Sequence, residues 1–202
     1  AKGCIVWGGS LNLAPADEKI ISVERPLEID AESQLLASIM AKKHSVSSTH
    51  ILIDIPVGND TKVKTMLGAH KLKEKFEDIG RKLKKKVRVI ITDGNQPIGN
   101  GIGPALEVRD VLWLLKRDPR RPMDLERKCL YMCANIFEMV GIKNGHKKAF
   151  SILNSGKAYQ KFIEIVKAQG GKEIAAEDIK IGKFSHDVLS PKSGRVKDID
   201  NF

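Results

Sequence analysis

The apolar positions of the chain follow two different spacings, and together they predict a mixed α/β fold. Apolar residues recur every three or four positions in 32–43, 65–86 and 104–115, the spacing of one helix face. Short continuous apolar runs at 50–57 and 87–92 are typical of buried strands. Strands that alternate with helices in this order predict a mostly parallel sheet flanked by helices.

Other segments predict the rest of the architecture. The run Gly3–Trp7 indicates one more buried strand, and Leu13–Asp17 indicates a turn. Helical spacing continues in 125–140, 147–153 and 157–168.

The pattern changes after Gly171, where short alternating segments such as 194–199 predict the beginning of a C-terminal α+β domain. These segments are too few to close a layer, and the chain opens on a strand. We therefore expect these residues to be a fragment of a longer chain.

Composition excludes several classes of protein. With 202 residues, 42% of them hydrophobic and 30% charged, the chain is neither wholly disordered nor fibrous. No apolar run reaches the roughly 20 residues that cross a bilayer, and no secretory leader is visible. The three cysteines show no C-x-x-C spacing, which favours a reducing compartment, the cytoplasm.

The formal net charge is +10, and its densest basic stretch is 71–86. A nucleic-acid footprint is one interpretation. The solvated face of an amphipathic helix is the other, and we favour it for two reasons. No aromatic residues alternate with the lysines as stacking platforms. The apolar residues form one helical stripe: Ala69, Leu72, Phe76, Ile79 and Leu83.

Two groups of residues could carry chemistry. Ser38 and Lys42 are four positions apart and share a helix face; with Arg25 they could donate to a flat heterocycle bearing carbonyl oxygens. The spacing alone also fits a packing serine and a solvated lysine.

The second group is the glycine-rich turn Gly94–Gly103, which follows a strand and precedes a helix. It does not match G-x-G-x-x-G. A tight turn, an anion site at the helix N-terminus, and carbonyls facing a cation above Asp110 all remain open.

Four motifs then occur in order: 6–17 (VWGGSLNLAPAD), 36–43 (LASIMAKK), 92–99 (TDGNQPIG) and 103–109 (GPALEVR). Together they resemble the thymidine and pyrimidine-nucleoside phosphorylase family. The segment 53–64 is similar to the longer branch of that family, which includes archaeal AMP phosphorylases and bacterial thymidine phosphorylases.

The resemblance implies a pentosyltransferase that cleaves thymidine with inorganic phosphate, giving thymine and 2-deoxyribose 1-phosphate. Ser38 and Lys42 match the family's base-binding serine and lysine. Arg25 matches the base-binding arginine if a two-residue gap is allowed. A nucleoside monophosphate phosphorylase acting on AMP is the alternative, and a nucleic-acid-binding module is a third reading.

The resemblance also implies a monovalent cation held by Ile98, Gly101 and Asp110, where the family's usual acid is glutamate; no other cofactor is expected. The family's phosphate-binding loop has no match in this sequence, so no phosphate-binding residue is assigned. We expect these 202 residues alone to be inactive.

The family's architecture implies a helical lobe against an α/β lobe. Residues 14–48 would belong to the helical lobe, and 1–13 with 49–150 to the α/β lobe. Residues 151–202 would form linker helices and the start of the C-terminal domain. The expected partners are a nucleoside and phosphate, with neither a membrane nor a nucleic acid, and the full-length enzyme would be a homodimer.

Overall fold

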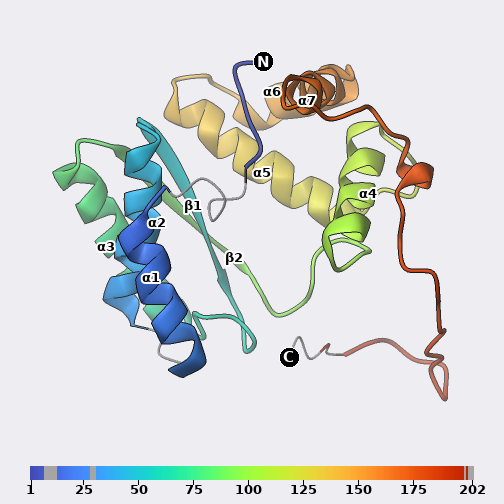
Figure 1. Ribbon diagram of the computed structural model, residues 1–202, viewed down its shortest axis with the longest axis horizontal. Helices are drawn as coiled ribbons and strands as arrows, with labels where there is room; N and C mark the ends of the chain where they lie inside the picture. The colour runs from blue at the N-terminus through green and yellow to red at the C-terminus, as the bar shows by residue number, and fades with distance from the viewer. Residues whose placement is uncertain (7–12, 28–30, 198, 200–202) are drawn as a thin grey trace. The chain divides into compact units, whose positions relative to one another are not determined.

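The computed structural model describes residues 1–6, 13–27, 31–197 and 199. The chain divides into two compact units (Figure 1). The N-terminal unit comprises Ile5–Val57 and Thr61–Thr92. The C-terminal unit comprises Ala1–Cys4, Gly58–Asp60 and Asp93–Phe202.

The N-terminal unit combines helices with a small sheet. Its elements, in chain order, are α1 (Pro15–Glu24), the 3-10 helix η2 (Arg25–Leu27), α2 (Glu32–Ser45), β1 (His50–Val57), α3 (Met66–Lys82) and β2 (Lys86–Asp93). The two strands pair in parallel, and α3 provides the crossover between them. The predicted α/β class is therefore confirmed.

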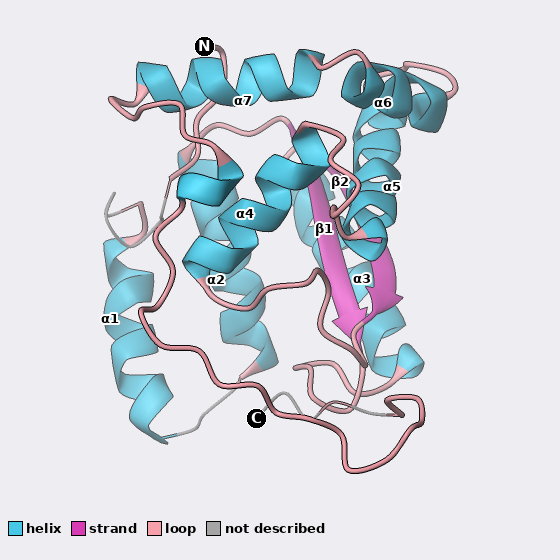
Figure 2. Ribbon diagram, turned by 90° about the vertical axis from the view of Figure 1, so that its right-hand side faces the viewer, coloured by secondary structure: helices cyan, strands magenta, loops and turns pink. Residues whose placement is uncertain are grey.

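Alternating burial along β1 shows which face of the sheet packs on the helices. Ile51, Ile53 and Ile55 are buried while the residues between them are not, which is the period of two that a strand imposes. These isoleucines share one core with Leu72 and Phe76 of α3, which lies against the strands in Figure 2. The apolar stripe of α3 is thus confirmed as its buried face.

The C-terminal unit is helical. Its helices are α4 (Pro104–Leu115), α5 (Met123–Met139), α6 (Gly145–Asn154) and α7 (Lys157–Ala168), followed by the 3-10 turn η3 (Ala176–Asp178). As predicted, Pro104 is the first residue of α4, where its missing N–H costs nothing. Close packing of α5 on α6 depends on Gly145, whose added Cβ would lie 2.4 Å from the Ala134 carbonyl oxygen.

Three local predictions were wrong. Residues 3–6 form no strand, and Ile5 is 58% exposed; Trp7 lies outside the described residues. Within the described part of the chain the sheet contains only β1 and β2, so residues 3–6 are not part of it. Of the turn predicted at Leu13–Asp17, only Leu13 and Ala14 form a bend, and α1 begins at Pro15. The described residues after Gly171 form η3 and no strand, where short alternating segments had predicted strands; the C-terminal α+β domain itself stays a prediction.

None of the helices in the described ranges is long and apolar enough to cross a membrane. The division into a helical lobe and an α/β lobe stays a prediction.

Candidate functional site

The candidate site is organised around Asp17, a residue that the sequence analysis did not single out. It lies in the first turn of α1, where Pro15 starts the helix and acidic side chains are favourable to the helix dipole. Its side chain is only 7% exposed. A carboxylate this deeply buried is stable only when hydrogen-bond donors surround it.

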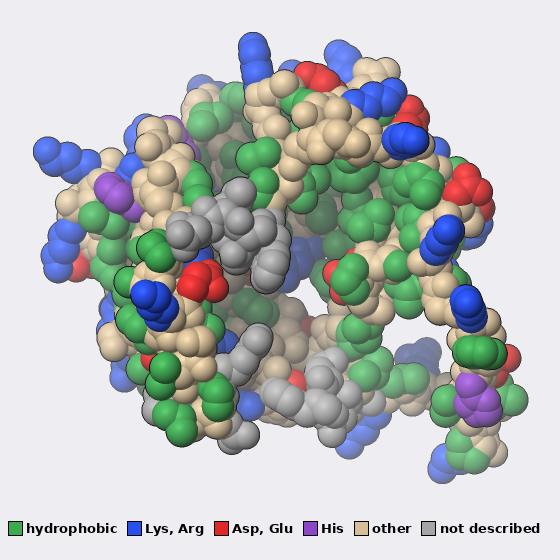
Figure 3. Space-filling view, in the orientation of Figure 1, with side chains coloured by type: hydrophobic (Ala, Val, Ile, Leu, Met, Phe, Trp, Pro, Cys, Tyr) green, Lys and Arg blue, Asp and Glu red, His purple; other side chains and the backbone are tan. Residues whose placement is uncertain are grey.

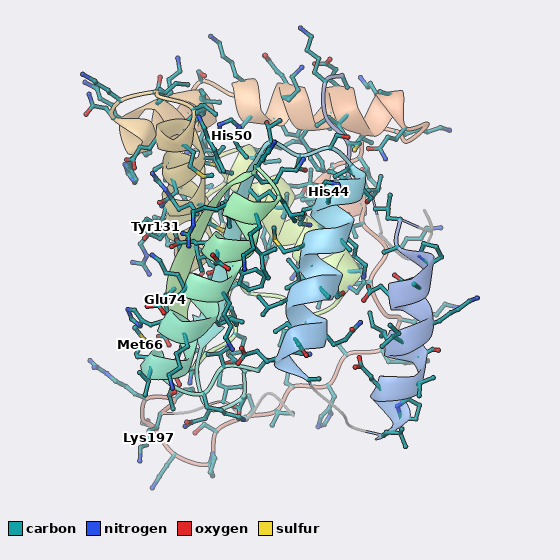
Figure 4. All side chains as sticks on the ribbon, turned by 90° about the vertical axis from the view of Figure 1, so that its left-hand side faces the viewer. His44, His50, Met66, Glu74, Tyr131 and Lys197 are labelled. Atoms are coloured by element: carbon teal, nitrogen blue, oxygen red, sulfur yellow. The ribbon has the colours of Figure 1, made fainter. Side chains whose placement is uncertain are left out.

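One face of α2 supplies those donors. Gln34 Nε2 lies 3.1 Å from Asp17 Oδ1, and Ser38 Oγ lies 2.8 Å from Asp17 Oδ2. Lys42 Nζ lies 3.0 Å from the same Oδ2. The three donors are spaced four residues apart, so they lie on the same side of the helix. Figure 4 shows α1 beside α2, with His44 marking the last turn of α2.

The acids of α1 hold Lys42 in its charged form. Its hydrogen bond to Asp17 raises the pKa of Lys42 above the usual value, and burial opposes that rise only in part. Glu18 Oε1, 3.4 Å from Lys42 Nζ, adds to the effect. The lysine side chain is still 26% exposed, so the ammonium group can be approached from outside.

The structure therefore brings together two of the three residues proposed to bind the base. Ser38 and Lys42 meet at Asp17. The backbone of Arg25 belongs to η2, but the Arg25 side chain lies outside the part of the chain that the structure describes. Residues 7–12 of the first motif also lie outside it.

The glycine-rich turn is closed by carboxylates from later helices. Asp110 Oδ2 accepts from the amides of Asn100 (2.6 Å) and Gly101 (2.9 Å). The amide of Gly99 donates to Asp124, and that of Gly103 donates to Glu107. These four amides are already bound to carboxylates, which argues against the anion-binding interpretation of this turn.

The turn is also sterically tight, as its glycines predicted. Gly99 has φ of +87°, a conformation that favours glycine. A Cβ at Gly101 would lie 2.4 Å from Leu106 Cβ.

Asp110 retains one feature that suits a cation. Its side chain is 1% exposed, and Oδ1 has no hydrogen-bond partner. Ile98 and Gly101 belong to the turn whose amides this carboxylate binds. Among the described residues, no group of three or more His, Cys, Asp or Glu side chains could hold a metal. A site here would therefore depend on main-chain oxygens beside the single carboxylate.

The basic surface of α3 carries ion pairs. Lys82 pairs with Asp78 at 2.7 Å, Lys73 pairs with Glu77 at 3.7 Å, and Lys75 pairs with Glu32 of α2. On the face drawn in Figure 3, Lys and Arg side chains are dispersed and do not form one patch. These observations agree with the solvated-face interpretation of this helix.

A second buried acid, Glu126 of α5, was also missed. It is 3% exposed and pairs with Arg117 at 2.6 Å and with Arg121 at 2.5 Å. Burial acts to raise the pKa of Glu126, but the two guanidinium groups outweigh it and hold the pKa below its usual value. The arginines follow α4 and the acid lies on α5, so this cluster ties the two helices together.

Comparison with known proteins identifies relatives over nearly the whole chain. A protein of Albidiferax ferrireducens named "Putative thymidine phosphorylase" is 43% identical over 203 residues, 99% of this chain and 39% of the relative. AMP phosphorylase 1 of Archaeoglobus fulgidus is 47% identical over 201 residues, 98% of this chain and 40% of the relative. The AMP phosphorylase of Methanococcus aeolicus is 45% identical over 202 residues, again 98% and 40%.

These names match the family that the sequence motifs resemble, so that prediction is confirmed. No protein-family profile matches the chain. The chain spans about 40% of the length of the curated relatives it matches.

Proposed function

We propose that this chain, which is homologous to thymidine and AMP phosphorylases, supplies the base-binding part of a nucleoside phosphorylase. The observation that carries the proposal is the convergence of Ser38 and Lys42 on one polar face of α2. The motifs assign both side chains to base binding, and both contact Asp17. The pKa of Lys42 is raised, which keeps the lysine cationic.

The proposed reaction transfers a pentose from a base to phosphate. A phosphate oxygen attacks the anomeric carbon as the glycosidic C–N bond breaks, and the bond's electron pair leaves with the base. The product is a sugar 1-phosphate of inverted configuration. Negative charge grows on the carbonyl oxygens of the departing base in the transition state. A fixed ammonium group such as that of Lys42 therefore stabilises the transition state more than the ground state.

We also propose a monovalent cation site at Asp110. Its buried Oδ1 would hold the ion together with main-chain oxygens of Ile98 and Gly101. The ion would neutralise the buried carboxylate and stiffen the turn that Asp110 already closes.

We propose thymidine as the substrate, with AMP as the second candidate because relatives of both names are 43–47% identical to the chain. We also propose that the enzyme acts in the cytoplasm as a homodimer. Phosphate would bind to residues outside this chain. Steady phosphate-dependent release of free base from the purified 202-residue chain would contradict that last proposal.

The test is phosphate-dependent base release by the complete gene product that contains this chain, with thymidine, uridine and AMP compared. Lys42→Ala should lower kcat/KM on the order of a hundredfold, the usual effect of removing one fixed donor to developing negative charge. Lys43→Ala is the matched control, because Lys43 is the neighbouring exposed lysine of the same helix. An unchanged kcat/KM in Lys42→Ala would contradict the proposed role of Lys42.

A further inference from the structure

We propose that Asp17 is a positioning residue that determines base specificity. It takes the hydroxyl proton of Ser38 and so leaves Ser38 as a hydrogen-bond acceptor toward the base. The site then selects a base that presents a ring N–H beside a carbonyl. This inference rests on the proposed function, since it assumes that the Ser38 face of α2 binds the base.

The first step is the direction of the bond between Ser38 and Asp17. A serine hydroxyl has one proton to donate and two lone pairs that accept. Its Oγ lies 2.8 Å from Asp17 Oδ2, which, as a carboxylate oxygen paired with the Lys42 ammonium, only accepts. The proton of Ser38 is therefore committed to Asp17, and only its lone pairs remain for a ligand.

The second step is that the geometry around Asp17 is fixed. Gln34 holds Oδ1 at 3.1 Å while Ser38 and Lys42 share Oδ2. The carboxylate is 7% exposed, so little water competes for the Ser38 proton. A hydrogen bond to a buried charged acceptor is stronger than one between neutral groups.

The third step is the pattern that the face presents to a ligand. Lys42 has three N–H donors; one lies toward Asp17 and one toward Glu18, which leaves the third. Ser38 as acceptor and Lys42 as donor then stand one helical turn apart. Uracil and thymine complement this pair with the N3–H and its neighbouring carbonyl. Cytosine and adenine present the reverse, an unprotonated ring nitrogen beside an amino group.

The experiment compares uridine with cytidine, which share their sugar and differ at this edge. We expect the complete gene product to prefer uridine in kcat/KM by at least about a hundredfold, because mismatched buried polar groups are left unpaired. Asp17→Ala should reduce this ratio at least about tenfold, because it removes the acceptor to which Ser38 donates, so the hydroxyl proton can turn toward the base. Glu18→Gln is the matched control: it removes a carboxylate from Lys42 but none from Ser38, so the ratio should stay within about threefold.

The outcomes separate this inference from the proposed function. A folded Asp17→Ala protein that releases uracil with an unchanged ratio overturns the role of Asp17 and leaves the phosphorylase proposal standing. Failure of the wild type to cleave thymidine, uridine or AMP overturns both, and cleavage of AMP in preference to uridine overturns this inference alone. If Asp17→Ala does not fold, binding to the wild type decides the question: uracil should bind on the order of a hundredfold more tightly than cytosine, and equal binding overturns the inference.

Discussion

Removal of the Asp110 carboxylate tests how the glycine-rich turn is built. In Asp110→Ala, the amides of Asn100 and Gly101 lose their acceptor, and Gly101 is buried, so water cannot easily replace it. The substitution also removes the unpartnered Oδ1. The turn should loosen where it leads into α4.

The magnitude follows from these contacts. Each hydrogen bond to a charged acceptor contributes about 1.5–3 kcal/mol. The net loss is smaller than the two hydrogen bonds together would give. Removing the carboxylate also removes the free-energy cost of burying its unsatisfied oxygen. We therefore expect the free energy of unfolding to fall by about 2–4 kcal/mol. Asp110→Asn keeps one acceptor oxygen and should cost about half as much.

The assay is urea denaturation followed by circular dichroism, with linear extrapolation to water. A loss below about 0.5 kcal/mol in Asp110→Ala would refute the view that Asp110 holds the turn. The same samples test the cation in potassium chloride against choline chloride at equal ionic strength. Potassium should raise the Tm of the wild type and leave that of Asp110→Ala unchanged; equal shifts in both proteins would count against the cation.

Two further predictions concern stability. Glu126→Gln should lower the free energy of unfolding by about 3 kcal/mol, because it leaves two arginines without their shared acid. The pKa of Glu126 is depressed in the folded state, so its contribution to the free energy of unfolding should be complete near neutral pH and be lost as the pH falls below about 4. The measurement is a pH series of urea melts, and equal stability of wild type and variant at neutral pH would contradict this prediction. Gly145→Ala should cost about 1–3 kcal/mol through the clash between α5 and α6, and an unchanged Tm would show that these helices can separate without penalty.

The polar face of α2 could be predicted from sequence because it is a local property. The apolar positions predicted the helix, and the spacing of four residues between Ser38 and Lys42 then predicted that they lie on one side of it. The same reasoning gave the buried stripe of α3, including Phe76 at 1% exposure. Periodicity was sufficient wherever one helix face met the core.

Asp17 was missed because α1 was predicted as a turn. The signal was present: Pro15 followed by Asp17 and Glu18 is a typical helix start. The residues that follow show only weak apolar periodicity, so no helix was predicted from this start signal. The contact itself, from Asp17 to donors 17 to 25 positions later, is set by the packing of two helices and not by spacing.

The glycine-rich turn shows the same limit. Its sequence allowed three uses, and the choice between them depends on which groups meet its amides. Those groups include Asp110 on α4 and Asp124 on α5, which only the fold brings to the turn. The stacking of Arg109 and Arg120 on Trp113, at 4.7 and 4.6 Å from the ring centre, is likewise a product of tertiary packing.

The most direct test of the central claim is a crystal structure of the complete gene product with a bound pyrimidine base. The account predicts that Ser38 Oγ and Lys42 Nζ both lie within about 3.2 Å of polar atoms of the base. A base bound elsewhere, with neither side chain in contact with it, would contradict the claim that this face of α2 receives the leaving group.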